Sequence, residues 1–84
     1  MSLEANVGMP VAYVLINCET GYERDVAERV GAIEGVREVY MVFGAFDLVV
    51  KVEADDLGRV REVVTGEIRR VPRVRSTLTL VVIK

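Results

Sequence analysis

The sequence has no histidine, no tryptophan, only one cysteine and two prolines. A single cysteine, Cys18, cannot form an intrachain disulfide, and without histidine it cannot complete the usual tetrahedral zinc site. The lack of histidine also removes the commonest general base and the usual activator of a cysteine nucleophile. No glycine-rich phosphate loop is present. We therefore expect no metal ion, no cofactor and no catalytic residues, and we expect that the chain is not an enzyme.

The length and charge point to a small folded domain. The chain has 84 residues, of which 51% are hydrophobic, and its formal net charge is −2. That composition excludes disorder and fits one domain, assigned here to residues 11–84, with residues 1–10 as an N-terminal leader or extension. Four arginines gather near the C-terminus, and the acidic total favours a solvated surface over direct nucleic-acid contact (Arg69, Arg70, Arg73, Arg75). No segment matches a membrane span or a signal peptide, so a cytoplasmic location without a membrane partner is expected.

The first half of the domain contains a strand followed by a helix. Residues 11–16 form an apolar, β-branched run without a polar break, which indicates a central strand buried on both faces. Thr20 followed by Glu23 has the spacing of a capping box, so a helix is expected to begin near Gly21 or Tyr22. Apolar residues at helical spacing follow it, and Gly35 is predicted to end the helix in a left-handed conformation.

The second half is expected to add a hairpin, a helix and a last strand. Strands are predicted at residues 36–43 and 46–53, joined by a tight turn at Gly44 and Ala45. Asp55 or Asp56 is a candidate cap for a second helix, which Pro72 ends, and residues 74–83 form the fourth strand. The order strand, helix, strand, strand, helix, strand predicts an α+β, ferredoxin-like βαββαβ fold. Its four-stranded antiparallel sheet has strand order 4-1-3-2 and carries both helices on one face.

Both faces of this sheet are predicted to be apolar, although only one is covered by helices. The side chains assigned to the helix-facing side are Phe46, Leu48, Val50, Leu78, Leu80 and Val82. Those assigned to the other side are Tyr40, Val42, Val49, Val81 and Ile83. Because monomers rarely expose large apolar patches, we expect this second side to pack on the sheet of another copy. The alternative is a valine-rich sheet that stays open to water.

Two polar segments are candidates for a ligand site. In the first, Gly44, Ala45, Phe46 and Asp47 combine a backbone open to close approach with a carboxylate that can pair with an ammonium group. In the second, Ser76, Thr77 and Thr79 offer hydroxyl groups along a strand. A simple turn and ordinary β-forming threonines are the structural alternatives. Strand parity puts Asp47, Thr77 and Thr79 on the helix-free side, and the strand order suggests that two subunits are needed to bring them together.

Three stretches carry a resemblance to a known family. They are residues 12–16 (AYVLI), 39–48 (VYMVFGAFDL) and 74–82 (VRSTLTLVV), and together they make the chain similar to the effector (RAM) domain of the Lrp/AsnC, or feast/famine, transcription regulators. The resemblance implies dimers that pair through their sheets and associate into octamers or decamers. It also implies amino-acid binding by Gly44, Ala45 and Asp47, with Thr77 and Thr79 from a neighbouring subunit. The chain departs from the family at Phe43 and Phe46, where threonine and tyrosine are frequent.

The resemblance also implies a stand-alone effector domain. Ten residues precede the first strand, too few for a helix-turn-helix, so we expect a module that binds an amino acid and modulates full-length regulators. Two other interpretations remain open. An ACT-like regulatory domain has the same fold and ligand class but pairs its sheets side by side. A dimeric α+β barrel enzyme also packs sheets face to face, but usually brings histidine or tryptophan into the barrel.

Overall fold

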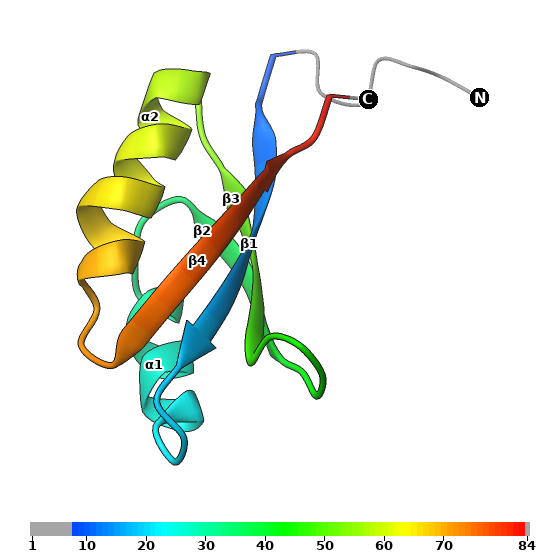
Figure 1. The fold of residues 1–84 in the computed structure, drawn as a ribbon. Helices are drawn as coiled ribbons and strands as arrows, with labels where there is room; N and C mark the ends of the chain where they lie inside the picture. The colour runs from blue at the N-terminus through cyan, green and yellow to red at the C-terminus, as the bar shows by residue number, and fades with distance from the viewer. Residues whose placement is uncertain (1–7, 84) are drawn as a thin grey trace.

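The computed structural model describes residues 8–83, and in this part of the chain four strands and two helical segments alternate as the sequence predicts (Figure 1). Strand β1 spans Val11–Cys18, helix α1 Glu23–Gly31, β2 Val36–Met41 and β3 Leu48–Glu53. The second helical segment comprises α2 (Leu57–Arg61), the π-helix η1 (Glu62–Glu67) and the 3₁₀-helix η2 (Ile68–Arg70), and β4 spans Val74–Val81.

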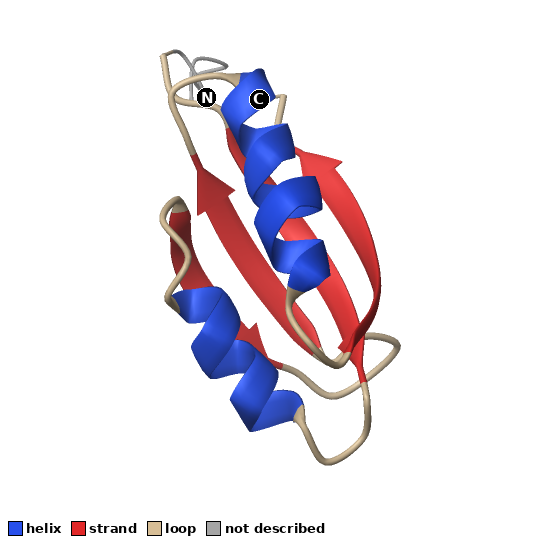
Figure 2. Cartoon of the chain, turned by 90° about the vertical axis from the view of Figure 1, so that its left-hand side faces the viewer, coloured by secondary structure: helices blue, strands red, loops and turns tan. Residues whose placement is uncertain are grey.

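The sheet has the predicted topology. Its strands are ordered β2-β3-β1-β4, and every neighbouring pair is antiparallel. Both helical segments lie on the same side of the sheet, which leaves the other side without a helix (Figures 1 and 2). The ferredoxin-like arrangement expected from the sequence is thereby confirmed.

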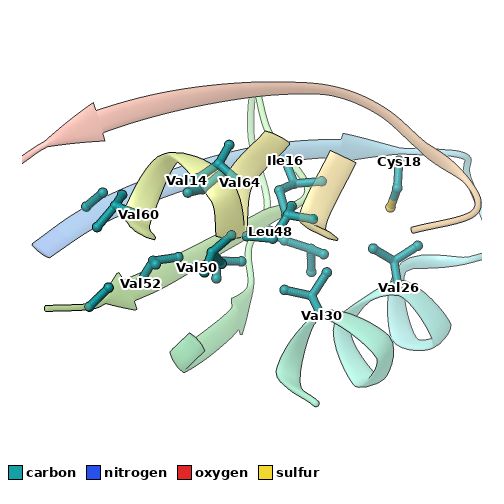
Figure 3. Packing of buried hydrophobic residues seen from close by; sticks show 14 residues of the cluster. Val14, Ile16, Cys18, Val26, Val30, Leu48, Val50, Val52, Val60 and Val64 are labelled. Atoms are coloured by element: carbon teal, nitrogen blue, oxygen red, sulfur yellow. The ribbon is translucent and has the colours of Figure 1, made fainter. Parts of the chain in front are cut away.

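The core fills the space between the sheet and the helices (Figure 3). β1 and β3 contribute alternate residues, so that Ile16, Leu48 and Val50 are completely buried. Val26 and Val30 of α1 pack on them from one side, while the second helical segment adds Val60, Val63, Val64 and Ile68. The prediction that β1 is buried on both faces is wrong, because its burial alternates and Tyr13 is exposed. The residues of β1 that face the helices are buried. Those that face the other side are more exposed because no layer covers them there.

The boundaries of α1 differ from the prediction at both ends. Glu23 does not complete a capping box with Thr20; its Oε1 instead accepts a hydrogen bond from the backbone N–H of Gly21 at 3.0 Å, and Tyr22 occupies the cap position without a side-chain bond. Gly21 has φ +95°, a conformation that turns the chain between strand and helix. At the other end α1 stops at Gly31, and Gly35, with φ +101°, serves the turn into β2 rather than the helix end.

The second helical segment begins and ends where the sequence predicts. Asp56 is the N-cap residue, and its Oδ1 accepts a hydrogen bond of 2.8 Å from the N–H of Arg59. Helical structure ends at Arg70, two residues before Pro72. Between these ends lies the unpredicted π-turn of η1, in which the N–H of Ile68 bonds to the carbonyl of Val63.

The connection between β2 and β3 is longer than predicted. β2 ends at Met41 and β3 begins at Leu48, so the tight turn expected at Gly44 and Ala45 is replaced by a wider loop. A backbone hydrogen bond of 2.9 Å from Val42 to the carbonyl of Asp47 closes it. Figure 1 shows this loop, residues 42–47, projecting on the helix-free side of the sheet. Phe43 on the loop is fully exposed.

The two faces of β4 are the reverse of the prediction. Thr77, Thr79 and Val81 pair with Ile16, Val14 and Ala12, all of which are buried under the helices. Directly paired residues share a face, so these three belong to the helix-facing side. Leu78 and Leu80 therefore lie on the helix-free side, opposite to their assignment from the sequence. A sheet face was also predicted for Phe46, Val42 and Ile83, but these residues lie outside the strands and belong to neither face.

Candidate functional site

Asp47 is held at the end of the sheet by two hydrogen bonds to β1. Its backbone N–H donates to the carbonyl of Ile16 at 2.9 Å. Its side-chain Oδ2 accepts a hydrogen bond, also 2.9 Å, from the backbone N–H of Cys18. The pairing of β1 with β4 is irregular between Asn17 and Cys18. A β-bulge of this kind leaves backbone groups outside the ladder, and the Asp47 carboxylate satisfies one of them.

A pocket of about 400 Å³ opens beside this carboxylate. It is formed where the end of β1 meets the residue preceding β3 and the beginning of β4. Its lining residues are predominantly polar: Asn17, Cys18, Thr20, Asp47, Arg75 and Ser76. The two charged members have opposite signs. Within residues 8–83 no ion pair joins Arg75 to Asp47, so the two charges remain available to a third group.

The structure brings together two of the predicted site residues and separates others. Asp47 and Ser76 line the same pocket of a single chain. The expectation that two subunits are needed concerns Asp47, Thr77 and Thr79, and it stays a prediction. Gly44, Ala45 and Phe46 precede Asp47 on the loop but do not line the pocket, although Gly44 has the positive φ of +153°. Thr77 and Thr79 lie elsewhere, on the helix-facing side.

Four residues of the pocket are not among the predicted site residues: Asn17, Cys18, Thr20 and Arg75. Arg75 is predicted to lie on a solvated surface because the net charge of the chain is −2. The strand register shows why this assignment of Arg75 was insufficient. Asn17 pairs with Ser76, and Ile16 pairs with Leu48. The end of β1 thus lies between the start of β4 and the start of β3. This proximity follows from the strand order already predicted, and it would have placed Arg75 near Asp47.

Burial and neighbouring carboxylates make the Cys18 thiol a poor nucleophile. Its pKa is raised above 9.0, first because the side chain is buried and then because the negative charges of Asp47 and Glu23 disfavour a thiolate. A thiolate is the reactive form of cysteine. Cys18 is therefore part of the pocket wall and of the core rather than a candidate for covalent chemistry.

The helix-free side of the sheet carries a second candidate surface, defined by two rows of paired residues. One row crosses all four strands with apolar side chains: Tyr40, Val49, Leu15 and Leu78. The next row is Glu38, Lys51, Tyr13 and Leu80. Tyr40 is 54% exposed, Leu78 48% and Leu80 50%. These eight residues are called the open face below.

Three polar side chains of the open face are paired with each other: Glu38, Tyr40 and Lys51. Lys51 Nζ lies 3.7 Å from Glu38 Oε2, and the Tyr40 hydroxyl donates a hydrogen bond of 2.8 Å to Glu38 Oε1. That bond and the negative charge of Glu38 raise the pKa of Tyr40 above 10.0. Because the charges on the open face are neutralised in pairs, the remaining surface there is apolar.

Comparison with known proteins identifies the family. The family model for the Lrp/AsnC ligand-binding domain matches residues 11–84. The chain belongs to this family. Its members of known structure include a hypothetical protein of Pyrococcus horikoshii, which is 37% identical, with a TM-score of 0.83 over 89% of this chain and 90% of that one. The family expected from the sequence is thus confirmed.

Two other similar proteins have the domain in different settings. A homocitrate synthase of Sulfolobus acidocaldarius is 39% identical over 88% of this chain, but the match spans only 16% of that protein. A feast or famine regulatory protein of Mycobacterium tuberculosis, solved with L-methionine, has the same fold, with 24% identity and a TM-score of 0.76. The match covers the whole of this chain and 56% of that one. A region similar to this chain thus forms part of a larger homocitrate synthase, and the same fold forms part of a longer regulatory protein.

The described residues contain no cluster of three or more metal-binding side chains, and none of their helices is long and apolar enough to cross a membrane. Their buried side-chain nitrogen and oxygen atoms all have hydrogen-bond partners. The polar groups that remain available to a ligand are therefore those at the surface, as in the pocket beside Asp47.

Proposed function

We propose that the chain is a regulatory module that binds a free amino acid in the pocket lined by Asp47, Ser76 and Arg75. One observation carries the proposal: a carboxylate and a guanidinium group line the same pocket without pairing with each other. An amino acid at neutral pH carries one ammonium and one carboxylate group. A charge-assisted hydrogen bond from the ammonium group to Asp47, and another from Arg75 to the ligand's carboxylate, would satisfy both.

The remaining polar groups of the pocket fit the same ligand. The Ser76 and Thr20 hydroxyls and the Asn17 amide can each donate or accept hydrogen bonds. The described residues that line the pocket include no histidine, and a raised pKa disfavours the thiolate form of Cys18. A binding role, rather than catalysis by this domain, therefore accounts best for the residues present. The L-methionine complex of the M. tuberculosis protein supports an amino acid as the class of ligand.

Assembly through the open face is the second part of the proposal. Tyr40, Leu78 and Leu80 are each about half exposed, and Leu15 and Val49 lie between them. A second copy that packs on this face would bury all five. Larger assemblies, such as octamers or decamers, would bring the loop of residues 42–47 to another chain, where Gly44, Ala45 and Phe46 can contact the ligand. Thr77 and Thr79 can join such a site only from a neighbouring copy.

The partner in the cell depends on the polypeptide of which the domain is part. Full-length Lrp/AsnC regulators are one proposed partner, through mixed assembly on the same open face. The homocitrate synthases offer another setting, in which the same domain would confer amino-acid control on an enzyme. In both settings the domain binds the ligand and another domain produces the response.

A thermal-shift screen of the twenty amino acids tests the ligand site. A ligand present at 100 times its dissociation constant should stabilise the protein by about 2.7 kcal/mol. Asp47→Asn removes the charge but keeps an oxygen that can accept the bond from Cys18, so it should fold normally and lose the response. Arg75→Gln should also lose it, whereas Asp55→Asn, an exposed aspartate outside this pocket, should respond like the parent. If Asp47→Asn retains the full shift, the site assignment is wrong.

A further inference from the structure

The helix-facing side has a second pocket, which shares only Thr79 with the residues of the proposed function. It is a groove of about 370 Å³ between the second helical segment and β4. Its walls are apolar and come from Leu57, Val60 and Val64 of the helical segment and from Val81 of β4. Figure 2 shows the helical segment over the central strands, with β4 running along its side at the edge of the sheet. The helix covers β4 incompletely, and Val81 remains 45% exposed.

Among residues 8–83, Arg61 is the only charged residue that lines the groove. Among the described residues Arg61 forms no ion pair, because the neighbouring Glu62 and Glu67 are both paired with Arg59. The other polar members are Thr65 and Thr79, and the Thr65 hydroxyl already donates a hydrogen bond of 2.8 Å to the carbonyl of Arg61. The groove therefore combines an apolar wall, one available cation and no carboxylate.

The backbone beside the groove is also unusual. Val64 and Thr65 belong to the π-helix η1, which lies between the α-helix α2 and the 3₁₀-helix η2. Such single π-turns are rare and occur frequently at functional sites. The π-turn coincides with the groove, which is a second observation independent of the side chains that line it.

From these features we propose that the groove binds a small aliphatic monocarboxylate, such as a branched-chain 2-oxo acid. The guanidinium group of Arg61 would hold the carboxylate, and the alkyl chain would lie against Leu57, Val60 and Val81. A free amino acid fits less well, because the groove has no anionic group to receive its ammonium. A second copy on the open face would leave the groove accessible, since the two surfaces lie on opposite sides of the sheet. The proposal is thus independent of the amino-acid site.

Methyl NMR spectra of the full chain test this proposal directly. The probes are 4-methyl-2-oxopentanoate, 4-methylpentanoate, 4-methyl-1-pentanol and L-leucine at millimolar concentration. We expect both acids to shift the methyl signals of Leu57, Val64 and Val81. The alcohol should bind about tenfold more weakly or worse, because it lacks the charge that Arg61 recognises. L-Leucine should leave these signals unchanged, even if it binds beside Asp47.

Two variants and one control complete the test. Arg61→Gln should weaken binding of the acids by about tenfold or more, and Leu57→Ala, at the exposed edge of the groove, should weaken it as well. Arg69→Gln, an exposed arginine that does not line the groove, should bind like the parent. Unshifted groove methyls, equal binding of the acid and the alcohol, or unchanged binding by Arg61→Gln would each overturn the proposal. Asp47→Asn should leave acid binding intact, which separates this site from the amino-acid pocket.

Discussion

Replacing Leu78 by glutamate should separate the proposed dimer into single chains. Complete burial of a leucine side chain stabilises by roughly 1.5–3 kcal/mol. Leu78 is 48% exposed in the single chain, so an interface would gain about half of this, or about 0.7–1.5 kcal/mol per copy. In a two-fold symmetric dimer each residue counts twice, which gives about 1.5–3 kcal/mol.

A loss of that size weakens the dimer by about tenfold to a hundredfold, and the charge that glutamate would bring into an apolar contact weakens it further. Sedimentation equilibrium across a range of protein concentrations measures the dissociation constant. Leu57→Glu is the matched control, because Leu57 is 56% exposed but lies on the helix side. A parent protein that is monomeric at high concentration would refute the reasoning. So would a Leu78→Glu variant that dimerises as well as Leu57→Glu.

Three further predictions concern stability and reactivity. Asp56→Ala should lower the free energy of unfolding by about 1 kcal/mol in urea titrations, because it removes the N-cap acceptor of α2. Gly35→Ala should destabilise by about 1 kcal/mol or more in the same assay, because φ is +101° and a Cβ atom would lie 3.3 Å from Val63 Cγ2. Cys18 should react with a thiol reagent only slowly below pH 9.0, and Asp47→Asn should speed the reaction by removing a charge that raises the thiol pKa.

The topology could be predicted from the sequence because local patterns and chain connectivity agree. Alternation in β3 correctly assigned Leu48 and Val50 to the core, and the prediction of Asp55 or Asp56 as the cap of the second helix is confirmed with Asp56. The same rule failed in β4. There the larger side chains, Leu78 and Leu80, suggested the buried face, whereas pairing with Ala12 and the other buried residues of β1 fixes the opposite one.

The failure in β4 has a physical cause. Alternation identifies a buried face only when the other face is exposed to water. On β4 the helix-facing side carries Thr77, Thr79 and Val81 because the helical segment covers this edge strand incompletely. Leu78 and Leu80 face away from the helices, where an apolar surface is useful only against another molecule. The strand pattern therefore supports the proposed assembly through the open face, whereas the prediction assigned these two leucines to the core.

Asp47 illustrates how a structural and a binding role can be separated. If the residue only satisfied the backbone N–H of Cys18, one neutral acceptor would be sufficient, and asparagine provides it. The carboxylate instead has a full charge without an ion-pair partner among residues 8–83, and that charge raises the pKa of the adjacent Cys18 thiol. An ionised acceptor strengthens the hydrogen bond from the Cys18 N–H, and it also leaves the pocket with a charge that has no ion-pair partner among residues 8–83. In the proposed function, this charge receives the ammonium group of an amino acid that enters the pocket between Asp47 and Ser76.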